Sequence, residues 1–160
     1  MTNLTHIGPD GRARMVDVTD KDTTARVATA HGFVRVSEDA FKLAVGRETK
    51  KGDPLAISEL AGIMAAKRTS DLIPLCHPLP LSGVKVDVIA IPESSSFRVL
   101  ATVKTSGKTG VEMEALTSVS AACLTLYDML KAIDKSMVID GIELLEKTGG
   151  KSGTYKKPGV

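Results

Sequence analysis

The segment TGVEMEALTSVSAACLTLYDMLKAI, residues 109–133, decides the fold of this chain. Its apolar side chains recur at alternating intervals of three and four residues, which places them on one face of an α-helix. The members of this series are Leu116, Val119, Cys123, Leu126, Leu130 and Ile133. The segment therefore predicts a long amphipathic helix.

A second helix is predicted directly after Asp53. Aspartate is a preferred N-cap residue, and Pro54 suits the first helical position because the N–H that proline lacks has no partner there. The expected apolar face consists of Ile57, Leu60, Ala61 and Met64, at helical spacing. The helix should end near Lys67 and Arg68, whose charges suit the carbonyl end of the helix dipole.

Four further segments have the β-branched or alternating pattern of strands, namely residues 24–36, 84–91, 97–105 and 137–145. Ser37 is the expected N-cap of a short helix after the first of them. From residue 24 the order is strand, helix, strand, strand, helix, strand, which is the split βαβ arrangement. We expect an α+β, ferredoxin-like fold, an antiparallel sheet backed by two helices, with residues 1–22 as a polar N-terminal arm.

Composition narrows the classes of function. The chain has 160 residues, a common size for one domain, so residues 1–160 are expected to form a single domain. Its 21 Lys and Arg nearly cancel its 19 Asp and Glu, and it has no Trp, so no nucleic-acid partner is expected. Uncharged stretches reach only 13 residues, whereas a membrane-spanning helix needs about 20. With no apolar signal segment at the N-terminus, a cytoplasmic location is expected.

The two cysteines, Cys76 and Cys123, show neither zinc-ligand spacing nor a disulfide framework. Both are expected to be reduced thiols, and no metal site is predicted. Cys76 lies in the segment LIPLCHPLPL, whose prolines exclude a helix or a central strand. The segment is expected to be an extended, anchored loop.

Two GK[ST] triplets, at residues 107–109 and 150–152, resemble part of a phosphate-binding loop. Both lack the earlier glycine of the full pattern. The first lies between a strand and a helix and predicts either a phosphate contact or an ordinary tight turn. The second belongs to an expected flexible tail, residues 147–160. There Lys147 and Lys151 either close over an anionic ligand or lie in solvent.

Several polar side chains are candidates for a site. His77 lies in the proline-rich loop, Lys51 precedes the Asp53 cap, and Glu112 and Glu114 open the long helix. Asp128 and Lys131 form an i, i+3 pair on the same helix. Each has a structural alternative: a buried core histidine, a helix-dipole carboxylate or a solvated ion pair.

The long helix separates these candidates. Glu114 and Asp128 are 14 residues apart, and a helix rises about 1.5 Å per residue, which gives roughly 21 Å. One compact reacting centre in one chain cannot readily use both. Either the ligand is long, or one of the two carboxylates belongs to a site on a neighbouring subunit.

Together the segments resemble the molybdenum cofactor biosynthesis protein C family, the cyclic pyranopterin monophosphate synthases. The matching strings are KRTSDLIPLCHPLPLSGVKV (67–86), KTGVEMEAL (108–116), YDMLKA (127–132), KSMVI (135–139) and KTGGKSG (147–153). They cover nearly the whole chain in order.

The resemblance implies an enzyme that converts 3',8-cyclo-7,8-dihydro-GTP to cyclic pyranopterin monophosphate and releases pyrophosphate. It implies a ferredoxin-like chain in a homo-hexamer, a trimer of dimers with sites between subunits, and an upstream radical cyclase as pathway partner. No cofactor is implied. By the same resemblance Leu75, Cys76, His77, Met113 and Glu114 contact the substrate, with Glu112 beside them. Asp128 is implied as the acid/base, Lys51, Lys131 and Lys147 surround the reacting and phosphate groups, and Arg26 comes from the neighbouring chain.

A different class of function is a non-enzymatic nucleotide-sensing, ferredoxin-like oligomer. Such a protein needs binding residues but no acid/base pair. The pairing of Asp128 with Lys131 argues against it, because a carboxylate beside an ammonium suits proton transfer.

Overall fold

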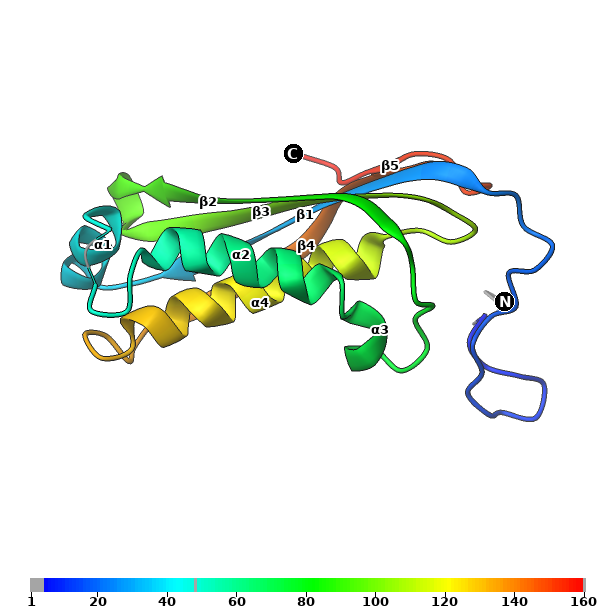
Figure 1. The fold of residues 1–160 in the computed structure, drawn as a ribbon, viewed down its shortest axis with the longest axis horizontal. Coiled ribbons are helices and arrows are strands. Elements are labelled where there is room, and N and C mark those ends of the chain that lie inside the picture. Colours follow the sequence, from blue (N-terminus) through cyan, green and yellow to red (C-terminus); the bar gives the residue numbers. More distant parts are fainter. Residues whose placement is uncertain (1–4, 48, 160) are drawn as a thin grey trace.

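Two layers run the length of the molecule, an antiparallel sheet and a pair of long helices that cover one of its faces (Figure 1). The computed structural model describes residues 5–47 and 49–159. Its helices are α1 (Glu38–Val45), α2 (Pro54–Ala66), α3 (Thr69–Leu72) and α4 (Glu112–Leu130), with one 3-10 turn, η1 (Pro92–Ser94). Its strands are β1 (Thr24–Arg35), β2 (Leu81–Ile91), β3 (Ser96–Gly107), β4 (Val138–Thr148) and β5 (Tyr155–Lys156).

The sheet has the strand order β2-β3-β1-β4-β5, and all neighbouring strands are antiparallel. β1 occupies the centre, where Ala30 lies opposite Ala101 of β3 and Leu144 of β4. The chain passes from β1 through α2 to β2, and from β3 through α4 to β4, which is the split βαβ connection. The predicted α+β, ferredoxin-like fold is confirmed.

Each edge strand of the longer four-stranded part of the sheet makes further hydrogen bonds with another segment of the chain. β5 pairs with the outer edge of β4, and the backbone N–H of Lys157 donates to the carbonyl of Leu145 at 2.7 Å. On the outer edge of β2, the N–H of Val88 donates to Oε1 of Glu59 at 3.0 Å. The segment beyond residue 147 therefore includes a short strand, while its expected mobility stays a prediction.

α4 lies against the sheet and forms the centre of the core. Its buried side chains include four of the predicted series, Val119, Cys123, Leu126 and Leu130; Leu116 is partly buried, and the predicted Ile133 lies beyond the helix and is 56% exposed. The helix is shorter than the predicted span and ends at Leu130. Beyond it, the Asp134 carboxylate accepts hydrogen bonds from the backbone of Ser37 and Ser136, which holds a turn instead of another helical turn. Among the described residues, no helix is long and apolar enough to cross a membrane.

α2 begins as predicted but turns a different face to the core. Asp53 caps it by accepting from two backbone N–H groups, and it ends at Ala66. Leu60 and Met64, expected on its packed face, are 56% and 55% exposed. The helix packs on α4 through small residues, because a Cβ at Gly62 would lie 3.0 Å from the carbonyl oxygen of Ser118. The close approach of the two helices leaves the bulkier apolar side chains outside.

Other boundaries differ by a few residues. β4 extends to Thr148, beyond the expected end at Leu145, so Lys147 belongs to a strand. β2 begins at Leu81, and the short helix α3 was not predicted. The expected short helix is α1, whose cap Ser37 accepts from the N–H of Ala40. In its described part, residues 5–22, the N-terminal arm contains only an isolated bridge, Ile7 to Ala13, and it lies at one end of the layers in Figure 1.

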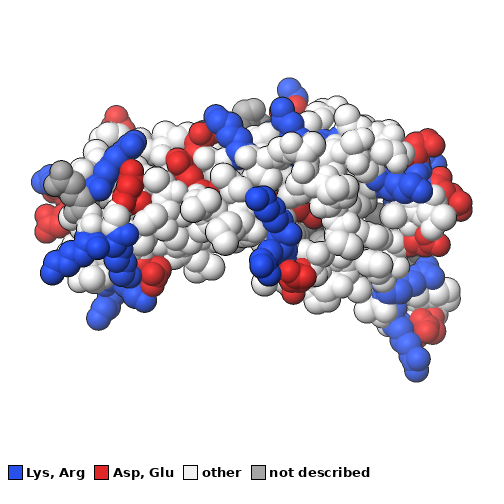
Figure 2. Space-filling model, in the orientation of Figure 1, with Lys and Arg blue, Asp and Glu red and all other residues white. Residues whose placement is uncertain are grey.

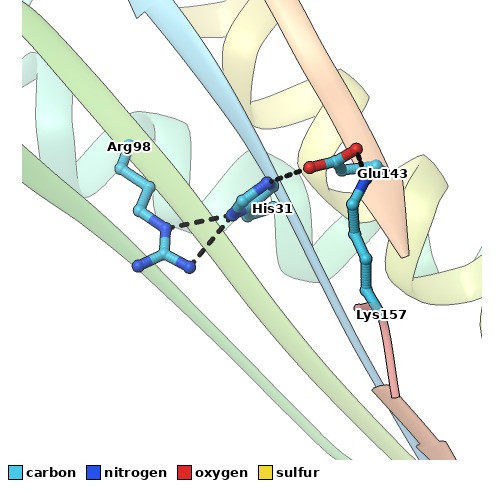
Figure 3. A network of polar contacts seen from close by, with 4 residues as sticks. All are labelled: His31, Arg98, Glu143 and Lys157. Carbon is cyan, nitrogen blue, oxygen red and sulfur yellow. Dashed lines mark hydrogen bonds and ion pairs between the residues drawn. The ribbon is translucent and has the colours of Figure 1, made fainter. Parts of the chain in front are cut away.

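On the helix-free face of the sheet, a polar network joins β3, β1, β4 and the segment after β5 (Figure 3). Arg98 donates to Nδ1 of His31 at 3.0 Å, and Nε2 of His31 lies 2.9 Å from Glu143, which also pairs with Lys157. Because an arginine can only donate, Nδ1 carries no proton and the imidazole is neutral. Burial lowers the pKa of His31, and the charges of Arg98 and Lys157 lower it further.

Gly32 is required at the contact between β1 and α4. A Cβ there would lie 2.8 Å from the side chain of Val119 on α4 and 2.9 Å from that of Ile142 on β4. We expect Gly32→Ala to lower the free energy of unfolding by about 1–3 kcal/mol, the usual cost of overpacking a core. Gly83→Ala, whose nearest neighbour would be 3.9 Å away, is the control and should change it little. Urea denaturation measures both, and equal stability of the two variants would contradict the packing argument.

The neutral His31 predicts a pH dependence of stability. Its pKa is lower in the folded chain than its ordinary value of 6.5, so the unfolded chain takes up more protons as the pH falls through 6.5. The free energy of unfolding should therefore decrease between pH 7.5 and 5.5. His31→Asn should remove this part of the slope. Urea titrations at several pH values test it, and a slope unchanged in the variant would assign the pH dependence to other groups.

Candidate functional site

A cluster of one carboxylate and two ammonium groups lies at the C-terminal end of α4. Nζ of Lys131 is 2.6 Å from Oδ1 of Asp128, and Nζ of Lys51 is 3.4 Å from Oδ2. Lys51 also donates to the Asp128 carbonyl at 3.3 Å. Asp128 lies in the last turn of α4, Lys131 follows it as the C-cap, and Lys51 comes from the loop before α2. These three residues, the lysine–aspartate cluster, are those the sequence predicted as catalytic.

The charges in this cluster fix its protonation state. Hydrogen bonds from Lys131 and Lys51 lower the pKa of Asp128, and the bond to Asp128 raises the pKa of Lys131. The side chains are exposed, so the ion pairs add little to stability. An ionised carboxylate held between ammonium groups can accept a proton from a bound ligand and return it.

At the opposite end of α4, a cavity of about 330 Å³ brings together six predicted ligand residues. They are Leu75, Cys76 and His77 from the proline-rich loop and Glu112, Met113 and Glu114 from the first turn of α4. The N-terminal arm supplies a further wall. We refer to this space as the histidine cavity.

Two groups in the histidine cavity have raised pKa values. Glu114 is only 4% exposed, and burial, together with the nearby charge of Glu112, raises the pKa of its carboxyl. Burial and the Glu114 carboxylate raise the pKa of the Cys76 thiol, which keeps it protonated. The pKa of the Glu114 carboxyl is thus shifted upward, opposite to the shift of Asp128.

Beside the histidine cavity lies a second cavity of about 560 Å³, lined by basic side chains. These are Lys21, Arg26, Lys108, Lys147 and Lys151, with Asp22 and Glu112 as the acidic residues of its wall. The two cavities share Lys21, Thr109, Gly110 and Glu112. This cationic cavity can hold several negative charges of one ligand, and its continuity with the histidine cavity suits an elongated anion.

Glycines let the C-terminal loop approach Arg26. Gly149 and Gly150 have φ of +91° and +75°, a region that disfavours other residues. A Cβ at Gly149 would clash with the backbone carbonyl of Ala25, so only glycine fits there, and Gly150 lies against the guanidinium of Arg26. Nε of Arg26 donates to the carbonyl of Gly107 at 2.9 Å. Arg26 thus joins the two loops that carry the GK[ST] triplets, and both triplets border the cationic cavity.

The structure divides the predicted site between the two ends of α4. Leu75, Cys76, His77, Glu112, Met113, Glu114, Arg26 and Lys147 surround the paired cavities, and Lys51, Asp128 and Lys131 form the distant cluster. In Figure 2, charged side chains gather toward the ends of the molecule, and a largely uncharged surface covers much of its middle. One chain alone does not bring the two groups of residues together.

The sequence missed Lys21, which lines both cavities. Only its positive charge distinguished Lys21 in the sequence. The described part of the arm forms no helix or extended strand, so no periodic pattern could place this residue. Within residues 5–47 and 49–159, no group of three or more His, Cys, Asp or Glu side chains could hold a metal ion.

Comparison with known proteins gives a consistent result. The model of the MoaC family matches residues 15–150. A cyclic pyranopterin monophosphate synthase of Cereibacter sphaeroides strain KD131 is 56% identical over 156 residues, covering 98% of each chain. Proteins of the same name from Dinoroseobacter shibae and Corynebacterium glutamicum strain R are 54% and 55% identical. These alignments cover 98% and 97% of this chain and 99% and 98% of the relatives.

Proposed function

This chain belongs to the MoaC family, and we propose on that basis that it is a cyclic pyranopterin monophosphate synthase. It is then a lyase that converts 3',8-cyclo-7,8-dihydro-GTP to cyclic pyranopterin monophosphate with release of pyrophosphate, an early step of molybdenum cofactor biosynthesis. The observation that carries this function is the pair of adjoining cavities, one cationic and one lined by His77 and Glu114. A nucleotide-derived substrate needs both, a site for its triphosphate and a site for its ring system.

The cationic cavity is suited to the release of pyrophosphate. As the cyclic phosphate closes, a substrate hydroxyl loses its proton, its oxygen bonds to the α-phosphorus, and the bond to the pyrophosphate breaks. Negative charge then develops on the leaving group. Arg26, Lys147 and Lys21 are placed to stabilise it without further rearrangement.

Proton transfers in the ring rearrangement need both an acid and a base. Asp128 is kept ionised by Lys131 and Lys51 and serves as the base. Burial raises the pKa of Glu114, and we assign this carboxyl as the matching acid in the histidine cavity. Two carboxyl groups whose pKa values are pushed apart in this way are typical of acid/base pairs in active sites. His77 and Cys76 would contact the substrate between them.

A second copy of the chain can bring the two groups of residues together. If two α4 helices cross antiparallel about a two-fold axis near their midpoint, the lysine–aspartate cluster of one copy faces the histidine cavity of the other. The outer surface near that midpoint is suited to such a contact, because Leu60, Met64 and Leu124 are 56%, 55% and 63% exposed there. Ser120 and Ala121 beside them are small enough for close approach.

We further propose that three such dimers form a hexamer, as the resemblance implies, with Arg26 of one chain acting in a site shared with its neighbour. The enzyme would act in the cytoplasm on the product of an upstream radical cyclase. The nearly balanced net charge of +2 agrees with a protein that has no nucleic-acid partner.

Asp128→Asn tests the assigned chemistry. The amide keeps the size and hydrogen bonding of the side chain but cannot exchange a proton in the same way. We expect a folded protein that binds substrate and releases pyrophosphate at least about 100-fold more slowly, the lower end of the effect of losing a general acid/base. Single-turnover pyrophosphate release measures this rate.

The matched control for this variant is Asp71→Asn. Asp71 forms an exposed i, i+3 ion pair with Arg68, like that of Asp128 with Lys131, but lies outside both cavities. It should leave the rate unchanged. Equal rates for Asp128→Asn and the unmodified enzyme would make Asp128 a structural helix residue. If the unmodified chain bound the substrate without turnover, the nucleotide-sensing alternative would replace the enzyme.

Mixing two inactive variants tests the shared site. Arg26→Ala damages the cavity end of α4 and Asp128→Ala the other end, so a mixed dimer contains one site with neither defect. We expect mixtures subjected to subunit exchange to regain activity, up to about one quarter of normal for a random 1:1 mixture, because half of the dimers are mixed and each has one intact site of two. No recovery after proven exchange, or full activity of a monomer in sedimentation, would contradict the shared site.

A further inference from the structure

The N-terminal arm, here residues 5–23, forms one wall of the histidine cavity. Thr5, His6, Val16, Val18 and Lys21 all line that space. Most of the arm is exposed, and its backbone bonds are local, such as Arg14 to His6 and Lys21 to Val18. A segment with so few apolar contacts opens at a low free-energy cost unless something fixes it.

One side chain connects the arm to the domain. Nζ of Lys108 donates to the carbonyl of Thr19 at 2.6 Å. Among residues 5–47 and 49–159, it is the only hydrogen bond or ion pair between the arm and the remainder of the chain. Lys108 follows β3 directly and is itself placed by the turn that Arg26 holds through Gly107.

The arm presents this carbonyl in a defined turn. The Asp17 carboxylate accepts from the backbone N–H of Thr19 at 2.8 Å and from its hydroxyl at 2.6 Å. These bonds lower the pKa of Asp17, with a smaller contribution from the charges of Lys108 and His77. Val18 and Lys21, on either side of Thr19 in the chain, line the same cavity as His77, so fixing Thr19 also fixes these two residues at the cavity.

We propose that Lys108 is a positioning residue for substrate binding, which latches the N-terminal arm through the Thr19 carbonyl and so completes the wall of the histidine cavity. From the sequence, two interpretations of Lys108 remained open: a contact with phosphate, or an ordinary residue of a tight turn. Its bond to the arm is a different role, although an ammonium with three N–H groups can also face a phosphate. The substrate in this proposal rests on the proposed function, whereas the latch is a property of the free chain.

The latch predicts a distinct kinetic effect. Lys108 bonds the arm only through the Thr19 carbonyl, a backbone group that takes no part in the proton transfers, so the wall it holds contacts the substrate in the ground state and the transition state alike. Losing such uniform binding raises KM and leaves kcat nearly unchanged. Losing the base at Asp128 instead lowers kcat.

Hydrogen exchange of the free protein is the decisive experiment. In Lys108→Met, which keeps the length of the side chain but not the ammonium, exchange over residues 16–22 should be about tenfold faster, as for the loss of one hydrogen bond to a charged group. The Lys21 amide, bonded to the Val18 carbonyl at 3.1 Å, is a suitable reporter. Lys108→Arg should restore slow exchange.

Lys151→Met is the matched control, because it removes the same charge from the same cavity on the C-terminal loop. It should leave exchange in the arm unchanged. Unaltered exchange in folded Lys108→Met, or equal acceleration in both variants, would overturn the latch. If Lys108→Met fails to fold, Lys108→Gln repeats the test with a polar side chain.

Steady-state kinetics with the cyclised dihydro-GTP complete the test. KM should rise about tenfold in Lys108→Met, with kcat within about twofold of normal, and return in Lys108→Arg. A fall in kcat with unchanged KM would overturn the positioning role. If the unmodified chain releases no pyrophosphate from this substrate, the proposed function fails, while the exchange measurements still decide the latch.

Discussion

The length of α4 is the constraint on which the remaining structure depends. At about 1.5 Å per residue its 19 residues span roughly 28 Å, which matches the long strands of the sheet beneath it. Its buried side chains pack the core along that whole length, so the helix cannot be shortened without opening the sheet. Its two ends consequently hold their polar groups too far apart for one small reacting centre. The same packing that makes the fold stable keeps the two groups of candidate residues at opposite ends of one helix.

Those parts of the fold could be predicted that are determined by residues close together in the sequence. The caps at Ser37 and Asp53 act within four residues of the chain, and the period of α4 repeats over 19 residues. The orientation of α2 was not local. Its apolar face and its small-residue face both satisfy a helical period, and contact with Ser118 of α4 decided between them. An exposed apolar face such as that of Leu60 and Met64 has the same sequence pattern as a face that packs in the core.

The same distinction between local and long-range contacts explains which residues of the candidate site could be predicted. Asp128 and Lys131 were identifiable as a pair because one helical turn brings them together, whereas Leu75, Cys76 and Met113 came from family resemblance alone. Lys21 had no usable signal. The contact that secures its arm runs from Lys108 to a backbone carbonyl, and every residue except the last in a chain has such a carbonyl with the same chemistry. Contacts of this kind become visible only in three dimensions.

The hydrogen bonds made by the two edge strands also affect how these molecules can associate. An unpaired strand edge is a template onto which another chain can add, and this is a common start of aggregation. Here β5 pairs with Glu146 and Lys147 near one end of β4, and on the β2 edge the Glu59 carboxylate accepts the Val88 amide and places a negative charge beside the strand. Strand addition is disfavoured at these positions. Association is thereby directed to the faces of the two layers, which allow closed assemblies in place of fibres.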